Sequence, residues 1–209
     1  MAGNHSKRQA AGKAPPEVGT GRLRISSGTL RGRSVAAPPG EGTRPLLTRV
    51  RKSLVDILRP RLPGVAVLDL FAGSGAIGFE LLSNGASRCT MVEQSREVVD
   101  LIRRSATELG VRVAVHQADA LEFLTQSHPA EATYDLIVVA PPYNLGLQQR
   151  AVDGLAASTL VAPGGLVIVQ RDASEPEWQP GAGAFERVRT RSYGRTVFEF
   201  LESRPTGGG

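Results

Sequence analysis

The chain has 209 residues, of which 41% are apolar, which is enough to bury one core of ordinary domain size with short appendages. No apolar run approaches the roughly 20 residues of a membrane-spanning helix, and the Lys/Arg/Gly-rich N-terminus lacks the apolar segment of a secretory signal, so we expect a cytoplasmic protein. The single cysteine, Cys89, allows neither an intramolecular disulfide nor a cysteine metal cluster, and we expect a core thiol and no bound metal.

Positive charge is concentrated towards the N-terminus. Residues 1–59 hold twelve lysines and arginines and three acids, whereas the remainder holds thirteen basic and seventeen acidic residues. A basic segment on a slightly acidic body is the electrostatic footprint of a nucleic-acid binder. A solvated segment that only aids solubility is the alternative.

Three segments precede the expected main domain. Residues 1–21 are rich in Gly, Ala and Lys without apolar periodicity and predict a disordered basic arm. Residues 22–37 alternate around Ser27-Gly28 as a small β-hairpin. Residues 49–58 have apolar side chains at helical spacing, with Thr48 as the N-cap and prolines at 60 and 63 as stops. We assign residues 22–63 to nucleic-acid contact and residues 64–203 to the main domain.

The main domain alternates short apolar strands with amphipathic helices. The expected strands are 65–70, 88–92, 111–116, 136–139 and 165–170, and the expected helices are 76–83, 96–109, 120–126 and 147–158. This alternation predicts an α/β fold with a doubly wound, mostly parallel sheet. Two final runs, 185–191 and 196–201, have no helix between them and predict an antiparallel hairpin at the sheet edge.

A glycine pattern follows the first strand of this domain. Gly73, Gly75 and Gly78 form GxGxxG, which alone is weak evidence for a nucleotide cofactor. Asp69 precedes the turn, and a carboxylate there would oppose the pyrophosphate of a dinucleotide at the helix N-terminus. It suits the ammonium and sulfonium of S-adenosylmethionine, with Phe71 and Ser74 in the same loop. Holding the glycine turn through backbone N–H groups is the alternative role for Asp69.

Acids also follow the next two strands. Glu93 ends the second strand, where a carboxylate can accept hydrogen bonds from both ribose hydroxyls. Asp119 follows the third strand and suits either the adenine amino group or a helix N-cap, two roles that can coexist. Gln94 and Ala120 would then line the adenine slot.

The fourth strand is followed by Pro141, Pro142 and Tyr143, a rigid segment suited to holding a planar amino-bearing group. The alternative is a loop that only packs an aromatic ring. Methyl transfer from a sulfonium needs chiefly proximity and in-line orientation, because the leaving group is neutral, so no catalytic triad or metal is required.

These motifs resemble S-adenosylmethionine-dependent amino methyltransferases, and within them the bacterial family that methylates N2 of a guanine in 16S rRNA. Residues 22–38 and 42–54 look like that family's opening, and Asn84-Gly85-Ala86, Glu93 and Pro141 to Tyr143 extend the likeness to about residue 202. The matching N-terminal positions are Gly28, Arg31, Gly32, Arg33, Thr43, Arg44, Pro45, Arg49, Val50 and Arg51. The resemblance implies a Rossmann-like class I methyltransferase fold, to which the terminal hairpin also conforms, and 16S rRNA within an assembled or assembling 30S particle as the partner. Its RNA contacts are expected at Arg31, Arg33, Arg44, Arg49 and Arg51.

The sequence departs from the resembled pattern at three positions. Ala140 stands where amino methyltransferases usually carry Asp or Asn, and Thr48 and Lys52 replace acids. One good hydrogen bond to a reacting group is worth about 1 to 3 kcal/mol, or roughly ten- to a hundredfold in rate, so the loss at Ala140 slows an enzyme without abolishing it. A catalytically impaired RNA-binding or ribosome-assembly protein that retains the fold is therefore the alternative function.

Other classes fit less well. A DNA adenine methyltransferase would need a target-recognition insert, a protein-glutamine methyltransferase a helical N-terminal domain, and an NAD-dependent enzyme a second substrate domain. None of these is evident in the sequence.

Overall fold

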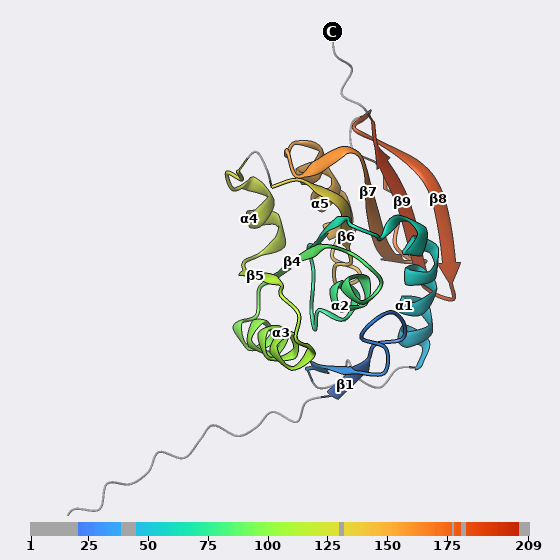
Figure 1. Cartoon of the computed structure of the whole chain (residues 1–209). Coiled ribbons are helices and arrows are strands. Elements are labelled where there is room, and N and C mark those ends of the chain that lie inside the picture. The colour runs from blue at the N-terminus through green and yellow to red at the C-terminus, as the bar shows by residue number, and fades with distance from the viewer. Residues whose placement is uncertain (1–20, 39–44, 130–131, 177, 181–182, 205–209) are drawn as a thin grey trace, which may run out of the picture.

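The computed structural model describes residues 21–38, 45–129, 132–176, 178–180 and 183–204 (Figure 1). The predicted basic arm lies outside these residues except for Gly21, which begins the first strand. None of the described helices is long and apolar enough to cross a membrane.

The core of the molecule is a seven-stranded sheet with the order β5-β4-β3-β6-β7-β9-β8. Its parallel part comprises β3 (Ala66–Asp69), β4 (Arg88–Glu93), β5 (Ala114–Gln117), β6 (Tyr134–Val139) and β7 (Val161–Asp172). The strands β9 (Thr196–Ser203) and β8 (Phe185–Tyr193) are antiparallel, and β8 is the sheet edge. The doubly wound sheet and its terminal hairpin confirm the fold prediction.

Helices cover both faces of the sheet (Figure 1). One hydrophobic cluster joins the sheet to α1 (Pro45–Leu58), α2 (Ala76–Ser83) and α3 (Arg96–Leu109), and a second joins it to α4 (Ala120–Thr125) and α5 (Leu147–Ala156). A short 3-10 helix, Arg59–Arg61, follows α1. The predicted start of α1 was wrong, because Pro45 occupies the first helical position, where its fixed φ is favourable, and Thr48 lies within the helix instead of capping it.

The N-terminal hairpin consists of β1 (Gly21–Arg24) and β2 (Ser34–Ala37) and packs against α2 and α3. The Ser26 backbone N–H donates to Glu80 Oε1 at 2.7 Å, and the Ala36 N–H donates to Ser105 Oγ at 3.0 Å. Leu23, Ile25 and Val35 belong to the same hydrophobic cluster as α1. The hairpin therefore contributes side chains to the hydrophobic cluster that joins the sheet to α1.

Candidate active site

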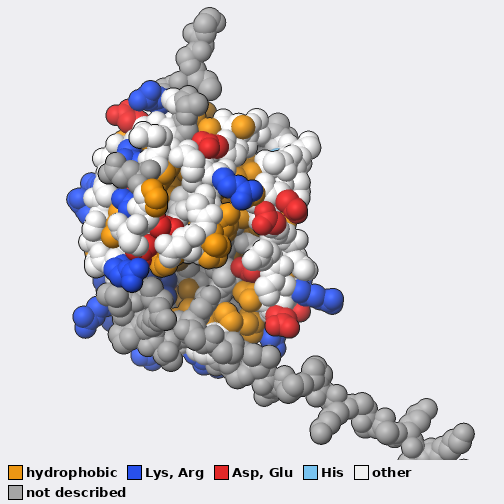
Figure 2. Space-filling model, turned by 180° about the vertical axis from the view of Figure 1, so that it is seen from behind, with side chains coloured by type: hydrophobic (Ala, Val, Ile, Leu, Met, Phe, Trp, Pro, Cys, Tyr) orange, Lys and Arg blue, Asp and Glu red, His pale blue; other side chains and the backbone are white. Residues whose placement is uncertain are grey.

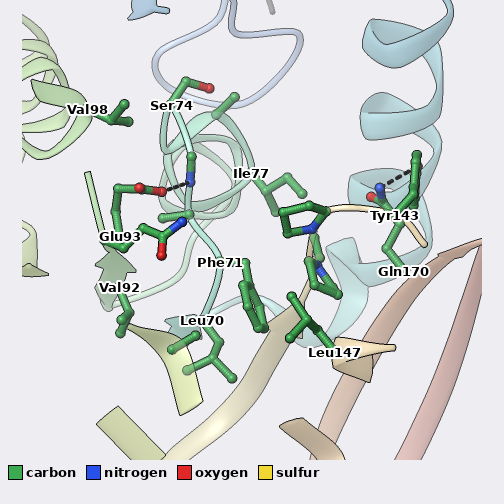
Figure 3. A pocket seen from close by; sticks show the side chains of 18 of the residues that line it. Leu70, Phe71, Ser74, Ile77, Val92, Glu93, Val98, Tyr143, Leu147 and Gln170 are labelled. Carbon is green, nitrogen blue, oxygen red and sulfur yellow. Dashed lines mark hydrogen bonds between the residues drawn. The ribbon is translucent and has the colours of Figure 1, made fainter. Parts of the chain in front are cut away.

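A cavity of about 710 Å³ opens where the parallel strands end, at the edge of the sheet where doubly wound folds bind their ligands. Figure 3 shows Glu93 on one side of this cavity and Tyr143 with Gln170 on the other. Most of the predicted site residues line it: Phe71, Gly73, Ser74, Glu93, Gln94, Asp119, Ala120, Pro141, Pro142 and Tyr143. The fold therefore brings the two halves of the predicted site, within residues 71–120 and 141–143, into one cavity.

The glycine loop packs tightly between β3, β4 and α2. Gly73 and Gly75 have φ of 52° and 75°, in the left-handed region that favours glycine. A Cβ on Gly78 would lie 2.5 Å from Met91 Cε and 2.9 Å from Cys89 Sγ. Cys89 is accordingly a buried packing residue, and burial raises the pKa of its thiol. Small residues here let α2 begin directly beside the cavity.

Asp69 is buried beneath this loop, with 1% of its surface exposed. Its Oδ2 accepts a hydrogen bond from the Gly78 N–H at 3.2 Å, and burial raises its pKa from 3.8 to about 7. Its side chain does not line the cavity. The hydrogen bond from Gly78 corresponds to the alternative role, in which Asp69 holds the glycine turn. Its Oδ1 has no hydrogen-bond partner among the described residues. Because the side chain does not line the cavity, direct contact between Asp69 and a cofactor stays a proposal.

Glu93 lies at the tip of β4 and joins three structural elements. Its Oε2 accepts from the Gly73 N–H at 3.0 Å (Figure 3). Its Oε1 accepts from the N–H of Ser95, the residue that caps α3, at 2.8 Å. Each carboxylate oxygen can accept a further hydrogen bond. The half-buried Glu93 therefore fixes the glycine loop and can also receive two ribose hydroxyls.

Asp119 caps α4, as one of its two predicted roles requires. Its Oδ1 accepts from the N–H groups of Leu121 at 2.8 Å and Glu122 at 3.1 Å. Both bonds use the same oxygen, and the residue also lines the cavity. The capping geometry thus leaves Oδ2 able to accept from an adenine amino group.

The opposite wall is built on the segment after β6. The Tyr143 hydroxyl accepts from Gln170 Nε2 at 2.7 Å and lies 3.5 Å from Thr196 Oγ1. Glu175 holds the following turn by accepting from the Asn144 N–H at 2.5 Å, Gln148 Nε2 at 2.9 Å and the Asp172 N–H at 2.7 Å. The sequence did not lead us to expect Gln170, Thr196 or Glu175 at this site. For Gln170 a signal was available, because it is a polar residue at the end of the apolar run in β7.

The predicted RNA-binding arginines divide into separate groups. Arg51 is only 8% exposed; its Nη2 donates to the Arg24 carbonyl at 3.0 Å, and its Nε lies 3.4 Å from Glu80 Oε1. Arg33 donates to the carbonyls of Leu109, at 2.7 Å, and Glu108, at the end of α3. Both guanidinium groups make contacts within the protein, so their predicted contact with RNA stays a prediction.

The other three arginines have different positions. Arg31 is exposed in a loop that rests on Ser83, at the end of α2 that lies farthest from the cavity. Arg49 is exposed on α1 beside Val50, which lines the cavity. Arg44 lies outside the described residues. Within the described part of the chain, no group of three or more His, Cys, Asp or Glu side chains is arranged to hold a metal ion.

Comparisons with known proteins agree with this architecture. The model of a family described as conserved hypothetical protein 95 matches residues 23–202. Ribosomal RNA small subunit methyltransferase D of Escherichia coli K12 is 34% identical over 161 residues, which cover 77% of this chain and 80% of that protein.

Two solved structures are also similar. A putative methyltransferase, yhhF, from Escherichia coli has a TM-score of 0.76 and 28% identity over 89% of this chain and all of that one. The Thermus thermophilus 16S rRNA N2 G1207 methyltransferase RsmC, in complex with AdoMet and guanosine, has a TM-score of 0.68 and 24% identity over 92% of this chain and 53% of that one. The second likeness shows the shared fold, that of a class I methyltransferase.

Proposed function

The chain belongs to the family described as conserved hypothetical protein 95, and from that premise we propose that it transfers a methyl group from S-adenosylmethionine to the exocyclic N2 of a guanine in 16S rRNA. The observation that carries this proposal is the single cavity in which Glu93 and the glycine loop face Pro141, Pro142 and Tyr143. The named relative modifies small-subunit rRNA, and we propose the assembled or assembling 30S particle as the substrate here.

The cofactor wall fits S-adenosylmethionine by its donors and acceptors. Glu93 receives the ribose hydroxyls, Asp119 the adenine amino group, and the glycine loop allows close approach of the backbone. Asp69 lies buried beneath the loop, and its Oδ1 has no hydrogen-bond partner among the described residues, so a cationic cofactor bound above the loop would favour the charged form of this carboxyl group. When bound, the cofactor supplies an electrophilic methyl group on a neutral leaving group.

The acceptor wall orients the base. Tyr143 stacks on the guanine ring, with its hydroxyl fixed by Gln170, and the Pro141 carbonyl accepts one hydrogen of the N2 amino group. Stacking contributes on the order of 1 to 3 kcal/mol per base, which is as much as one good hydrogen bond to a side chain at position 140 would contribute, so the ring by itself provides substantial positioning. The natural Ala140 is therefore compatible with transfer.

We propose that the RNA backbone contacts a surface formed by α1 and the edge strand β8. The register pairs Arg189 with Phe200 and Arg191 with Phe198, and both phenylalanines belong to the hydrophobic cluster that α1 covers. Arg49, Arg189 and Arg191 are exposed, and Phe198 and Val50 line the cavity. In Figure 2 Lys and Arg side chains gather along the left margin, the side on which β8 lies, whereas the right margin carries both signs of charge. Phosphates would lie beside the cavity mouth on this surface.

The decisive experiment compares the N2-methylated guanines of 16S rRNA from cells with and without the gene. We expect one guanine to lose its methyl group in the deletion strain and to regain it with the wild-type gene but not with Tyr143→Ala. Purified protein should methylate 30S particles from the deletion strain. Binding of those particles without any transfer would support the impaired RNA-binding alternative instead.

A further inference from the structure

We propose that Gln170 supplies the second hydrogen-bond acceptor for the target amino group, in place of the side chain that Ala140 lacks. The inference rests on the proposed function, because it names a residue that orients the nitrogen in that reaction. Three features of the structure support it: the register of β6 and β7, the hydrogen bond from Gln170 to Tyr143, and the polar lining of this end of the cavity.

An exocyclic amino group has two N–H donors and presents its lone pair most fully when both donors are satisfied in a fixed geometry. The Pro141 carbonyl accounts for one donor. Ala140, at the adjoining position, offers no side-chain acceptor. A buried donor without a partner is costly, so a second acceptor on the same wall would hold the lone pair on the line of transfer.

The sheet register places Gln170 beside the gap. The parallel pairing of β6 with β7 aligns Val138 with Ile168 and Val139 with Val169, and continuing it by one residue brings Ala140 level with Gln170. Side chains at equivalent positions of paired strands point to the same face of a sheet. Ala140 packs against the hydrophobic cluster that contains Phe198, and Phe198 is the partner of Gln170 on β9. Both residues line the cavity.

The amide of Gln170 has a defined orientation. Its Nε2 donates to the Tyr143 hydroxyl at 2.7 Å (Figure 3), which leaves the carbonyl oxygen, Oε1, as its acceptor. The other polar side chains at this end of the cavity offer less. Thr196 already lies within 3.5 Å of the same tyrosine hydroxyl, and that hydroxyl is occupied by both neighbours. Gln170 thus provides an amide oxygen on the wall where the base must lie.

The assigned role is hydrogen-bond acceptance and not proton abstraction. In the transfer the N2 lone pair forms the N–C bond while the S–C bond breaks with its electrons retained by sulfur, and one N2 proton then passes to water. A neutral amide takes no proton, so Gln170 acts by orienting the amino group. Tyr143, held by the same amide, stacks on the ring from which that group projects.

The test is single-turnover methylation of 30S particles from the deletion strain, with cofactor affinity measured by calorimetry for each variant. Gln170→Leu, which keeps the size and removes the acceptor, should slow transfer roughly ten- to a hundredfold with unchanged cofactor affinity. Gln170→Glu, which keeps an acceptor oxygen, should stay within a few-fold of wild type. Thr196→Val is the matched control, since it removes the other contact of the Tyr143 hydroxyl and leaves Gln170 in place.

Rescue separates the acceptor role from simple support of Tyr143. Adding Ala140→Asp to Gln170→Leu restores an acceptor at the adjoining position but no contact to Tyr143, and it should recover most of the lost rate. A wild-type rate in Gln170→Leu, equal slowing in Thr196→Val, or a Gln170→Glu variant as slow as Gln170→Leu would each overturn the inference. If the wild-type protein transfers nothing, the proposed function itself fails, which is a different result from a wild-type enzyme that is indifferent to residue 170.

Discussion

Glu93 should dominate the affinity for S-adenosylmethionine. Glu93→Ala removes a carboxylate positioned to accept two ribose hydroxyls, and hydrogen bonds to a charged group are worth about 1.5 to 3 kcal/mol. That range corresponds to roughly a ten- to 150-fold rise in Kd. The same carboxylate accepts from the Gly73 and Ser95 N–H groups, so the glycine loop also loses a support, and the effect should lie in the upper part of the range. Glu93→Gln should weaken binding almost as much, because its amide NH₂ faces one of these two backbone donors.

Isothermal titration calorimetry with S-adenosylmethionine measures the effect directly, and circular dichroism confirms that each variant is folded. Glu97→Gln is the matched control, because Glu97 is an exposed acid in the first turn of α3 and does not line the cavity. A Glu93→Ala protein that binds within about threefold of wild type, below the effect expected for even one charged hydrogen bond, would refute the ribose assignment. Tight NAD binding by the wild-type protein would refute the class of cofactor.

Three further predictions concern stability and RNA contact. Burial raises the pKa of Asp69 from 3.8 to about 7, so the folded protein binds the proton on this carboxyl group more tightly than the unfolded chain does. The stability that this proton contributes is complete below about pH 4 and is lost as the pH rises to 7. Asp69→Asn should therefore flatten the fall of Tm between pH 5 and 8, and an unchanged slope would contradict the burial argument. Arg51→Met leaves Glu80 buried without its cation and should lower the free energy of unfolding, measured by urea titration, by about 3 to 5 kcal/mol. Adding Glu80→Gln should restore part of this free energy, whereas an unchanged stability of Arg51→Met would mean that the ion pair is not formed. The double variant Arg49→Gln with Arg191→Gln should reduce the slope of log K for RNA binding against log salt concentration by roughly 0.7 to 0.9 per lost contact. Arg104→Gln, at an exposed position of α3, is the control, and an equal change in that variant would mean that the attraction is not confined to the proposed surface.

The sequence predicted most of the sheet well, because most of the parallel strands contain short apolar runs and the crossovers have helical periodicity. The exception is β5, where the mostly exposed strand Ala114–Gln117 begins three residues later than the predicted 111–116. The errors lie at element boundaries, where local pattern is weakest. The strand predicted at 165–170 extends over Val161–Asp172, and its pairing with β6 is irregular between Tyr134 and Leu136. Such extensions depend on tertiary pairing, which periodicity does not encode.

The candidate site was predictable where its residues are contiguous with a motif and unpredictable where they come from distant strands. Glu93 and Tyr143 follow recognisable strand ends, whereas Gln170 and Thr196 reach the cavity only because β7 and β9 pair with the parallel sheet. Charge counting likewise identified a basic segment but not the partners of its arginines. The acid Glu80 in the otherwise apolar α2 was a signal, because a buried carboxylate needs a cation, and Arg51 provides it from 29 residues away.

The two walls of the cavity are held by separate sets of hydrogen bonds. Glu93 ties the cofactor wall to the glycine loop and α3, while Gln170 and Glu175 fix the acceptor wall between β6, β7 and α5. Substitutions in one set should therefore alter cofactor affinity, and those in the other the rate of transfer, with little coupling between them. The tyrosine is already anchored through its hydroxyl, so stacking of a guanine requires little further ordering of the protein, and most of the stacking free energy remains available to position the base. This preorganisation gives a physical reason why a site with alanine at position 140 can still orient an amino group.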